Sequence, residues 1–363
     1  MIPRETPIHE PDALAGRVAS WPAGAIALDT EFVRERTYYP KLCLLQAASG
    51  ADIGLVDTLA IADGGALAPL LSDAARPKLL HAARQDIEAL LPLTGRPLAP
   101  VFDTQQAAAL LGFPAQVGYG ELVRQVLGIE LPKGHARTDW ARRPLSPEQL
   151  AYAADDVRHL PALTGALDAR LVAAGRRAWL DEESAALSDL ALYRVDPAEA
   201  WRRLKGAERL DDAAFAAACT LAEWRERRAM ERNLPRGWVL PDPAIYELAT
   251  LRPRTRDAMA RIPSVPAGTA ARAADDMLAA IASATHAVPP RDFAEVQRPG
   301  PEQLRLQKAM QARLAEISAA LGIQPEVLAT RRELAALARG TRDLPVMRGW
   351  RREAVGEKLL AAL

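Results

Sequence analysis

The chain has 363 residues, a formal net charge of zero, 49% hydrophobic residues and 25% charged residues. This length predicts two or three domains, and the composition is ordinary for a globular protein. A zero net charge neither indicates nor excludes a nucleic-acid partner, so the local arrangement of charge has to decide.

The cysteines and the N-terminal residues argue against several classes of protein. Cys43 and Cys219 are the two cysteines and form no Cys-x-x-Cys pair, which argues against a disulfide framework and a cysteine zinc site. Residues 1–11 contain no apolar stretch typical of a secretory signal. No apolar run approaches the roughly 18 residues needed to span a bilayer. We therefore expect a soluble cytoplasmic protein.

The segment Ala25–Phe32 is predicted to be a buried strand that carries two carboxylates. Asp29 and Glu31 are two residues apart, so their side chains project from the same side of the strand. Adjacent carboxylates repel each other and lose hydration, whereas a hard divalent cation would be held by them. The alternative is that both residues lie in a solvated loop after the strand.

The segments that follow predict a small sheet with helices. Lys41–Ala47 and Ile53–Asp57 have the composition of strands, and together with the first strand they suggest an antiparallel meander. A helix begins at Leu67–Leu71, and Lys78–His81 is a compact fourth strand. Alternation of strands and helices from about residue 78 predicts an α/β or α+β domain.

Two acidic residues compete for a role in this part of the chain. Asp86 lies in a predicted helix, Ala82–Leu91, that Pro92 should end, and taken alone it is best interpreted as an exposed polar residue. Asp103 follows a short strand, and with Gln106 three residues later it predicts a capping box. Asp103 is therefore assigned to structure, although it remains a rival of Asp86 as a metal ligand.

A polar loop and a helix follow. The loop Lys133–Trp140 could meet a phosphate or a stacked base, but an ordinary surface connection with Trp140 turned inward is the favoured alternative. Ser146 begins a helix on which Tyr152 and Asp156 share one face. A phenol and a carboxylate at this spacing could also be a surface hydrogen-bonded pair.

The rest of the chain is predicted to be helical. We expect an α/β or α+β domain over residues 1–175, a helical linker over residues 176–209, and helical modules over residues 210–290 and 298–363. Between Arg331 and Arg352 there are seven arginines and two acidic residues. This excess of positive charge is a candidate phosphate-contacting face, and a solvated helix surface is the equal alternative.

The candidate carboxylates point to one chemistry when they are considered together. Four carboxylates without a histidine or cysteine cluster favour Mg²⁺ or Mn²⁺. Two such ions can support in-line attack on a phosphodiester. The residues of this set are Asp29, Glu31, Asp86 and Asp156, with Tyr152 available to orient a water molecule.

Several motifs resemble the bacterial ribonuclease D family, in the tyrosine branch of the DEDD exonuclease superfamily. They occur in the expected order over residues 20–175, and the two helical modules look like tandem HRDC domains. The motifs are Asp29-Thr30-Glu31-Phe32, Thr37-Tyr38-Tyr39-Pro40, His81-Ala82-Ala83-Arg84-Gln85-Asp86, Phe102-Asp103-Thr104-Gln105, Arg137-Thr138-Asp139-Trp140 and Tyr152-Ala153-Ala154-Asp155-Asp156.

The resemblance implies a fold, a reaction and a site. The fold would be an α/β ribonuclease-H-like domain, a mixed sheet flanked by helices, followed by two small all-α HRDC-like domains. The enzyme would remove nucleotides from RNA 3′ ends, tRNA precursors included, and release nucleoside 5′-monophosphates. Asp29, Glu31, Asp86 and Asp156 would bind two Mg²⁺ or Mn²⁺ ions, and Tyr152 would orient the water. Substrate contacts are expected from Phe32, His81 and Arg137, and we expect a monomer without a membrane partner.

Two other functions remain open at this stage. A 3′→5′ DNA exonuclease would use the same carboxylates, because discrimination depends on a contact to the ribose 2′-OH that no residue here can be assigned to. A non-catalytic nucleic-acid-binding scaffold is the other alternative, which the complete carboxylate set argues against. The loop Lys133–Ala136 departs from the more acidic, serine-containing sequence of the family, which leaves its contacts open.

Overall fold

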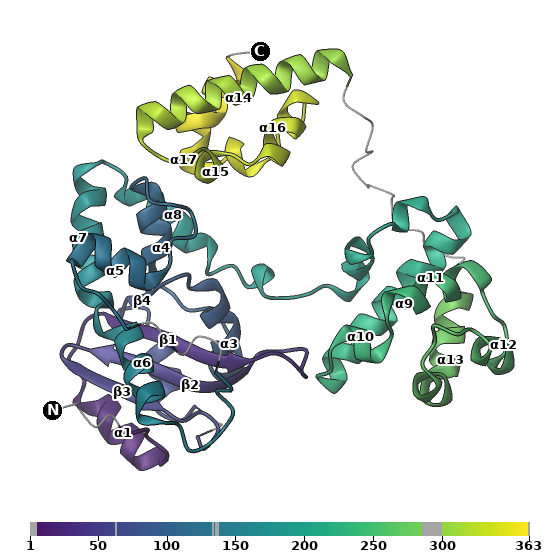
Figure 1. The fold of residues 1–363 in the computed structure, drawn as a ribbon, viewed down its shortest axis with the longest axis horizontal. Coiled ribbons are helices and arrows are strands. Elements are labelled where there is room, and N and C mark those ends of the chain that lie inside the picture. Colours follow the sequence, from purple (N-terminus) through teal and green to yellow (C-terminus); the bar gives the residue numbers. More distant parts are fainter. Residues whose placement is uncertain (1–5, 62–63, 133, 135–137, 285–299, 362–363) are drawn as a thin grey trace. The chain divides into compact units, whose positions relative to one another are not determined.

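The computed structural model describes residues 6–61, 64–132, 134, 138–284 and 300–361 (Figure 1). The chain forms two compact units. The first comprises the described parts of Met1–Val33, Leu42–Leu192 and Arg298–Leu363. The second comprises the described parts of Arg34–Lys41 and Tyr193–Gln297. No helix in the described ranges is long and apolar enough to cross a membrane.

A five-stranded mixed sheet forms the centre of the first unit. Its strand order is β3-β2-β1-β4-β5, in which β1, β4 and β5 run parallel and β2 and β3 run antiparallel. The carboxyl ends of the three parallel strands therefore lie at one edge of the sheet, where functional side chains can converge. The strands are β1 (Ile26–Val33), β2 (Lys41–Ser49), β3 (Asp52–Val56), β4 (Lys78–Leu80) and β5 (Val101–Asp103).

Helices pack on this sheet; α6 lies against β1 and β3, while α3 and α7 also contact β1. The helix α3 continues past Pro92 and ends at Gly95, which adopts the left-handed conformation. The prediction that Pro92 ends this helix is therefore wrong. The helices are α1 (Pro11–Ser20), α2 (Leu67–Ser72), α3 (Arg84–Thr94), α4 (Thr104–Leu110), α5 (Tyr119–Leu127), α6 (Pro147–Arg158), α7 (Leu160–Ala173) and α8 (Arg177–Ala186).

The C-terminal helical segment, residues 300–361, belongs to the first unit and shares its hydrophobic core. Met310 and Leu314 are in the same buried cluster as Leu163 and Leu167 of α7. Trp350 stacks on Trp179 of α8 with ring centroids 4.3 Å apart. The elements of this segment are α14 (Pro301–Leu321), α15 (Pro325–Leu328), α16 (Arg331–Ala338), η4 (Pro345–Met347), α17 (Gly349–Arg351), η5 (Arg352–Gly356) and α18 (Glu357–Leu360).

The second unit is helical and has its own core, which gathers around Phe215, Leu221 and Leu248. The long helix α9 begins at the N-cap Asp211 and ends at Asn233, which is left-handed. The helices are η1 (Leu190–Leu192, in the first unit), η2 (Pro197–Arg203), η3 (Ala207–Arg209), α9 (Asp212–Arg232), α10 (Arg236–Val239), α11 (Asp242–Leu251), α12 (Arg256–Ala260) and α13 (Ala267–Ser283).

A buried polar network joins the loop after β1 to the helices of the second unit. Tyr38 donates its hydroxyl hydrogen to Glu226, which is 0% exposed and also pairs with Arg236 and Arg203. The side-chain oxygen of Asn233 accepts hydrogen bonds from the backbone of Tyr38 and of the next residue. The guanidinium of Arg236 also lies 4.8 Å from the Tyr38 ring centroid, a cation–π contact that adds to the network.

We expect this network to make the second unit less stable as the pH falls into the acid range. Burial alone would raise the pKa of Glu226, but the hydrogen bonds from Arg236 and Tyr38 outweigh it and leave the pKa lowered. The stabilisation is therefore fully present above the unfolded pKa of about 4.3 and is lost as pH falls through the folded value. Urea unfolding should show a smaller decrease in stability between neutral pH and pH about 3 for Glu226→Gln than for the unmodified chain. Equal decreases would contradict this role.

Candidate active site

The strand β1 carries the first two carboxylates inside its length, because it continues through Val33. Asp29 and Glu31 are both partly buried, and Thr30 between them is buried. The alternative of a solvated loop is therefore wrong. Two carboxylates are held on one side of a strand that packs in the core.

The helix α6 brings the third carboxylate to the same place. Ser146 caps it as predicted, with the reciprocal bonds of a capping box to Gln149. Since α6 packs against β1, Asp156 meets the strand carboxylates. One oxygen from each of Asp29, Glu31 and Asp156 lies within 4.8 Å of the others.

Asp86 approaches this cluster from the first turn of α3, where it is 7% exposed. Its interpretation as an exposed polar residue is therefore wrong. Thr30 donates a hydrogen bond of 2.5 Å to its carboxylate. A tight turn before α3 aims it inward, because Ala82 has a φ of 57° in the left-handed region.

Asp103 stabilises that turn and the start of α4. Its carboxylate accepts hydrogen bonds from the backbone N–H groups of Ala82, Ala83, Gln105 and Gln106. The prediction of a helix cap is confirmed, although the side-chain oxygen of Gln106 has no hydrogen-bond partner, so the reciprocal half of the box is missing. Because backbone N–H groups occupy both of its carboxylate oxygens, Asp103 is not a rival of Asp86 as a metal ligand.

The pKa values of the four carboxyl groups are all raised, as expected for buried acids without a neighbouring positive charge among the described residues. Burial, followed by the charges of Asp29, Asp156 and Asp86, raises the pKa of Glu31 to about 9. Burial raises the pKa of Asp156 to about 7, against the lowering effect of the hydrogen bond from Tyr152. The pKa of Asp29 and that of Asp86 are also raised, mainly by burial.

A divalent cation fits this donor set. In the part of the chain that the structure describes, no arginine or lysine pairs with any of the four carboxylates. Folding gains nothing from crowding acids in this way, since desolvation and repulsion both oppose it. Oxygen-only donors within a few ångströms of one another match Mg²⁺ or Mn²⁺ rather than a softer metal.

A groove of about 950 Å³ opens beside the cluster, between α5 and α6. Asp156, Tyr152 and Tyr119 line it. Its other lining includes more acids than bases, and its Arg124 is paired with Glu121 at 2.6 Å. A polyanion would therefore be repelled from this groove unless bound cations offset the negative charge.

The predicted substrate-binding residues are placed as follows. Phe32 is partly exposed on β1, directly after Glu31. The ring nitrogens of His81 are engaged by Thr104 and by the carbonyl of Val117, so a substrate contact would have to use the face of the ring. Arg137 lies outside the described residues. Trp140 is 2% exposed, which confirms that it turns inward.

Two residues that support the site could not be recognised from sequence patterns. Thr30 donates a hydrogen bond to Asp86, although nothing in the Asp-Thr-Glu sequence indicates this role. Tyr119 lines the groove and donates its hydroxyl hydrogen to the carbonyl of Asp155, next to Asp156 of the carboxylate cluster. No local spacing indicates the role of either residue, because their hydrogen-bond partners lie on other elements, α3 and α6.

Known proteins are similar to this chain in both sequence and fold. A family model described as 3′-5′ exonuclease matches residues 7–171, and an HRDC domain model matches residues 214–281. The ribonuclease D of Acidiphilium cryptum is 40% identical, over 96% of this chain and 89% of that protein. The chain belongs to the ribonuclease D family. The ribonuclease D of Pseudomonas paraeruginosa is 39% identical, over 98% of this chain and 96% of that protein.

The likeness to the ribonuclease D family extends to three dimensions. A crystal structure of Escherichia coli RNase D, described as an exoribonuclease involved in structured RNA processing, has a TM-score of 0.86 and 31% identity. The match covers 99% of this chain and 98% of that one. The predicted family, the mixed sheet flanked by helices and the nuclease activity are therefore confirmed.

Proposed function

We propose that this ribonuclease D family member hydrolyses RNA from its 3′ end, with two divalent ions held by Asp29, Glu31, Asp86 and Asp156, and that tRNA precursors are among its substrates. The observation that carries this proposal is the cluster of buried and partly buried carboxylates on β1, α3 and α6, with which no arginine or lysine of the described residues forms an ion pair. When bound, the ions supply Lewis-acid activation of water and offset the charge of the phosphodiester.

The residues of the chain contribute positioning and proton control. Burial raises the pKa of Tyr152, so its phenol stays protonated at neutral pH and can only orient or donate a hydrogen. Its hydroxyl already bonds to Asp156, which places it where a nucleophilic water would be directed. Thr30 restrains Asp86, and Tyr119 restrains the backbone next to Asp156.

The proposal also covers organisation and setting. We divide the chain into a nuclease domain over residues 1–175, a linker over residues 176–209, an HRDC domain over residues 210–290 and an HRDC-like domain over residues 298–363. We also propose that the enzyme acts as a monomer, because the five active-site residues lie within one compact unit of the chain. Both cysteines are buried thiols and not part of a disulfide, which supports a reducing cytoplasm.

The direct test compares metals and substrates. We expect release of nucleoside 5′-monophosphates from a 3′-extended tRNA precursor in Mg²⁺ or Mn²⁺, and none in EDTA, because all the proposed ligands are carboxylates. A DNA of matched sequence should be degraded more slowly. Full activity in EDTA would overturn the metal assignment, and faster hydrolysis of the DNA would overturn the assignment of RNA as substrate.

Removal of one hydroxyl tests the tyrosine. Tyr152→Phe keeps the ring, which packs 6.2 Å from Trp140, and removes the orienting hydrogen bond. We expect kcat to fall roughly 10²-fold, while RNA affinity in Ca²⁺ stays nearly unchanged. The exposed Tyr39 provides the control, since Tyr39→Phe should leave kcat within about twofold. An unchanged kcat in Tyr152→Phe would show that this tyrosine only packs.

A further inference from the structure

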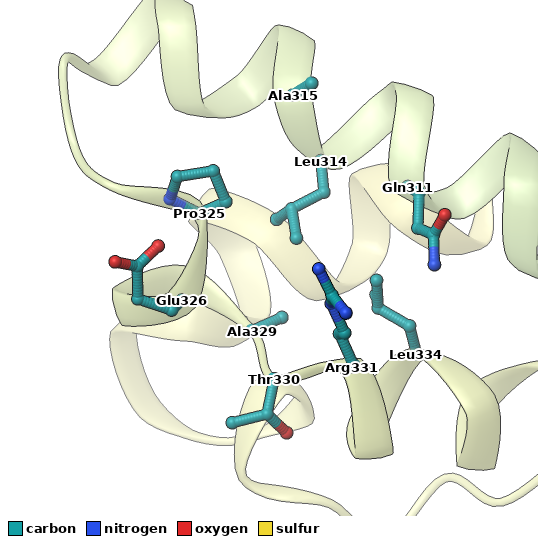
Figure 2. A pocket seen from close by; sticks show the side chains of 9 residues that line it. All are labelled: Gln311, Leu314, Ala315, Pro325, Glu326, Ala329, Thr330, Arg331 and Leu334. Atoms are coloured by element: carbon teal, nitrogen blue, oxygen red, sulfur yellow. The ribbon is translucent and has the colours of Figure 1, made fainter.

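A cavity of about 790 Å³ lies within the C-terminal helical segment, between α14 and the α15–α16 turn (Figure 2). Its floor is apolar and includes the buried Leu314, Ala329 and Leu334. None of the catalytic carboxylates lines it. Its volume is within the range of about 300–1,000 Å³ that is typical of ligand pockets.

One cation reaches into this cavity. Figure 2 shows Arg331 extending from the start of α16 toward Leu314 and Gln311, while Glu326 points away at the opposite edge. In the described part of the chain Arg331 forms no ion pair. The N-terminus of α16 is already capped by Thr330, so the guanidinium, not the helix end, offers the free donors.

The arginines of this segment divide into two groups. Arg348, Arg351 and Arg352 pair with acidic residues, so the predicted basic face of seven arginines is smaller than the sequence suggests. Arg331, Arg332 and Arg339 are exposed on or next to α16 and form no ion pair among the described residues. Arg305, Arg342 and Lys358 are also exposed and form no ion pair among these residues, so the unpaired positive charge is spread over the segment and includes the helix that borders the cavity.

The facing helix adds charge to the same rim. Lys308 is exposed and precedes the cavity residue Gln311 by three positions on α14, so the two side chains are neighbours on the helix surface. Lys308 also lacks an ion pair in the described ranges. An apolar floor bordered by unpaired cations from two helices suits a ligand that has both an apolar part and an anionic group.

We propose that this cavity binds one unstacked nucleotide of single-stranded RNA, with its base on the apolar floor and its phosphates paired with Arg331 and Lys308. A planar guanidinium can stack on a base and also bind phosphate through two hydrogen bonds. Stacking on the Arg331 guanidinium and contact with an apolar floor do not depend on which base is present, so the site would hold RNA of any sequence. An acidic peptide would satisfy the cations but would leave the apolar floor uncovered.

This inference rests on RNA being the substrate, and binding measurements with the full chain test it. In an Asp29→Asn background, Arg331→Gln should weaken binding of a 20-nucleotide single-stranded RNA about tenfold and reduce the slope of log affinity against log salt by about 0.7. A pentanucleotide should be too short to reach both sites, and its affinity should stay within about twofold. Arg348→Gln removes the same charge from a paired position and should change neither affinity.

A second variant separates the cavity from surface charge. Ala315 is exposed on α14 at the cavity edge, and Ala315→Leu would fill part of the space without changing charge. We expect it to weaken binding of the 20-nucleotide RNA about fivefold. Unchanged binding by this variant would overturn the cavity as the site.

Other outcomes would also overturn the inference: equal effects of Arg331→Gln and Arg348→Gln, or equal losses on the two RNAs. Binding of polyglutamate that depends on Arg331, with RNA binding unaffected, would assign the cavity to a protein partner instead. Hydrolysis of the pentanucleotide by the unmodified chain tests the proposed function separately. The binding measurements decide on the cavity in either case.

Discussion

Replacement of Asp29 by Asn should lower kcat by at least roughly 10³-fold, because a metal ion contributes several kcal/mol of transition-state stabilisation. Asp29 contributes an oxygen to the three-carboxylate cluster on β1 and α6. The same substitution removes one of the mutually repelling charges, so without divalent ions the variant should melt at a higher temperature, by about 2–4 °C for each kcal/mol of repulsion removed. Steady-state hydrolysis and thermal melting in EDTA measure the two effects.

Asp155 provides a close control for Asp29. It directly precedes the proposed ligand Asp156 on α6, but its carboxylate pairs with Arg158 at 2.8 Å. Asp155→Asn should therefore keep kcat within about twofold. If Asp155→Asn were as inactive as Asp29→Asn, loss of charge anywhere near the groove would explain both results, and the assignment of specific ligands would fail.

Truncation of Trp350 should have the largest effect on stability. Its ring stacks on Trp179, and its indole N–H donates a hydrogen bond of 2.7 Å to Glu183. The side chain is 6% exposed, and Trp350→Ala leaves a cavity where the C-terminal helical segment meets α8. We expect a loss of about 3–5 kcal/mol in the free energy of unfolding of the first unit, measured by urea denaturation.

The matched control is a tryptophan that does not pack in this way. Trp238, in the second unit, is 59% exposed, so Trp238→Ala should change the free energy of unfolding by less than about 0.5 kcal/mol. Similar losses in the two variants would mean that the stacked pair contributes nothing beyond an ordinary surface tryptophan. The same result would argue that the C-terminal helices do not support the nuclease fold.

The parts of the site that follow from local periodicity could be predicted. Alternation along a strand places Asp29 and Glu31 together, and a four-residue spacing on a helix places Tyr152 beside Asp156. That these two elements meet could not be derived from spacing, because it depends on how α6 packs against β1. The resemblance to a family supplied that step.

Other features escaped prediction because their partners are distant in sequence. The burial of Asp86 depends on a left-handed turn at Ala82 that Asp103 stabilises from another strand. The contact of Tyr38 with Glu226 joins residues that are 188 positions apart. A count of charges along the chain likewise cannot show which arginines form ion pairs. Arg351, for example, pairs with Glu183 of α8.

The shared core of the first unit has a consequence for how the chain is made. The hydrogen bond from the Trp350 backbone to Glu182 spans 168 residues, which a ribosome adds in about 8–34 s at about 5–20 residues per second. During that interval the sheet and its carboxylates have already been synthesised, while the C-terminal residues that pack on α8 around Trp179 have not. The nascent chain therefore exposes an apolar face of the kind that chaperones bind. The hydrophobic core of the first unit is complete only after residue 359 has been synthesised.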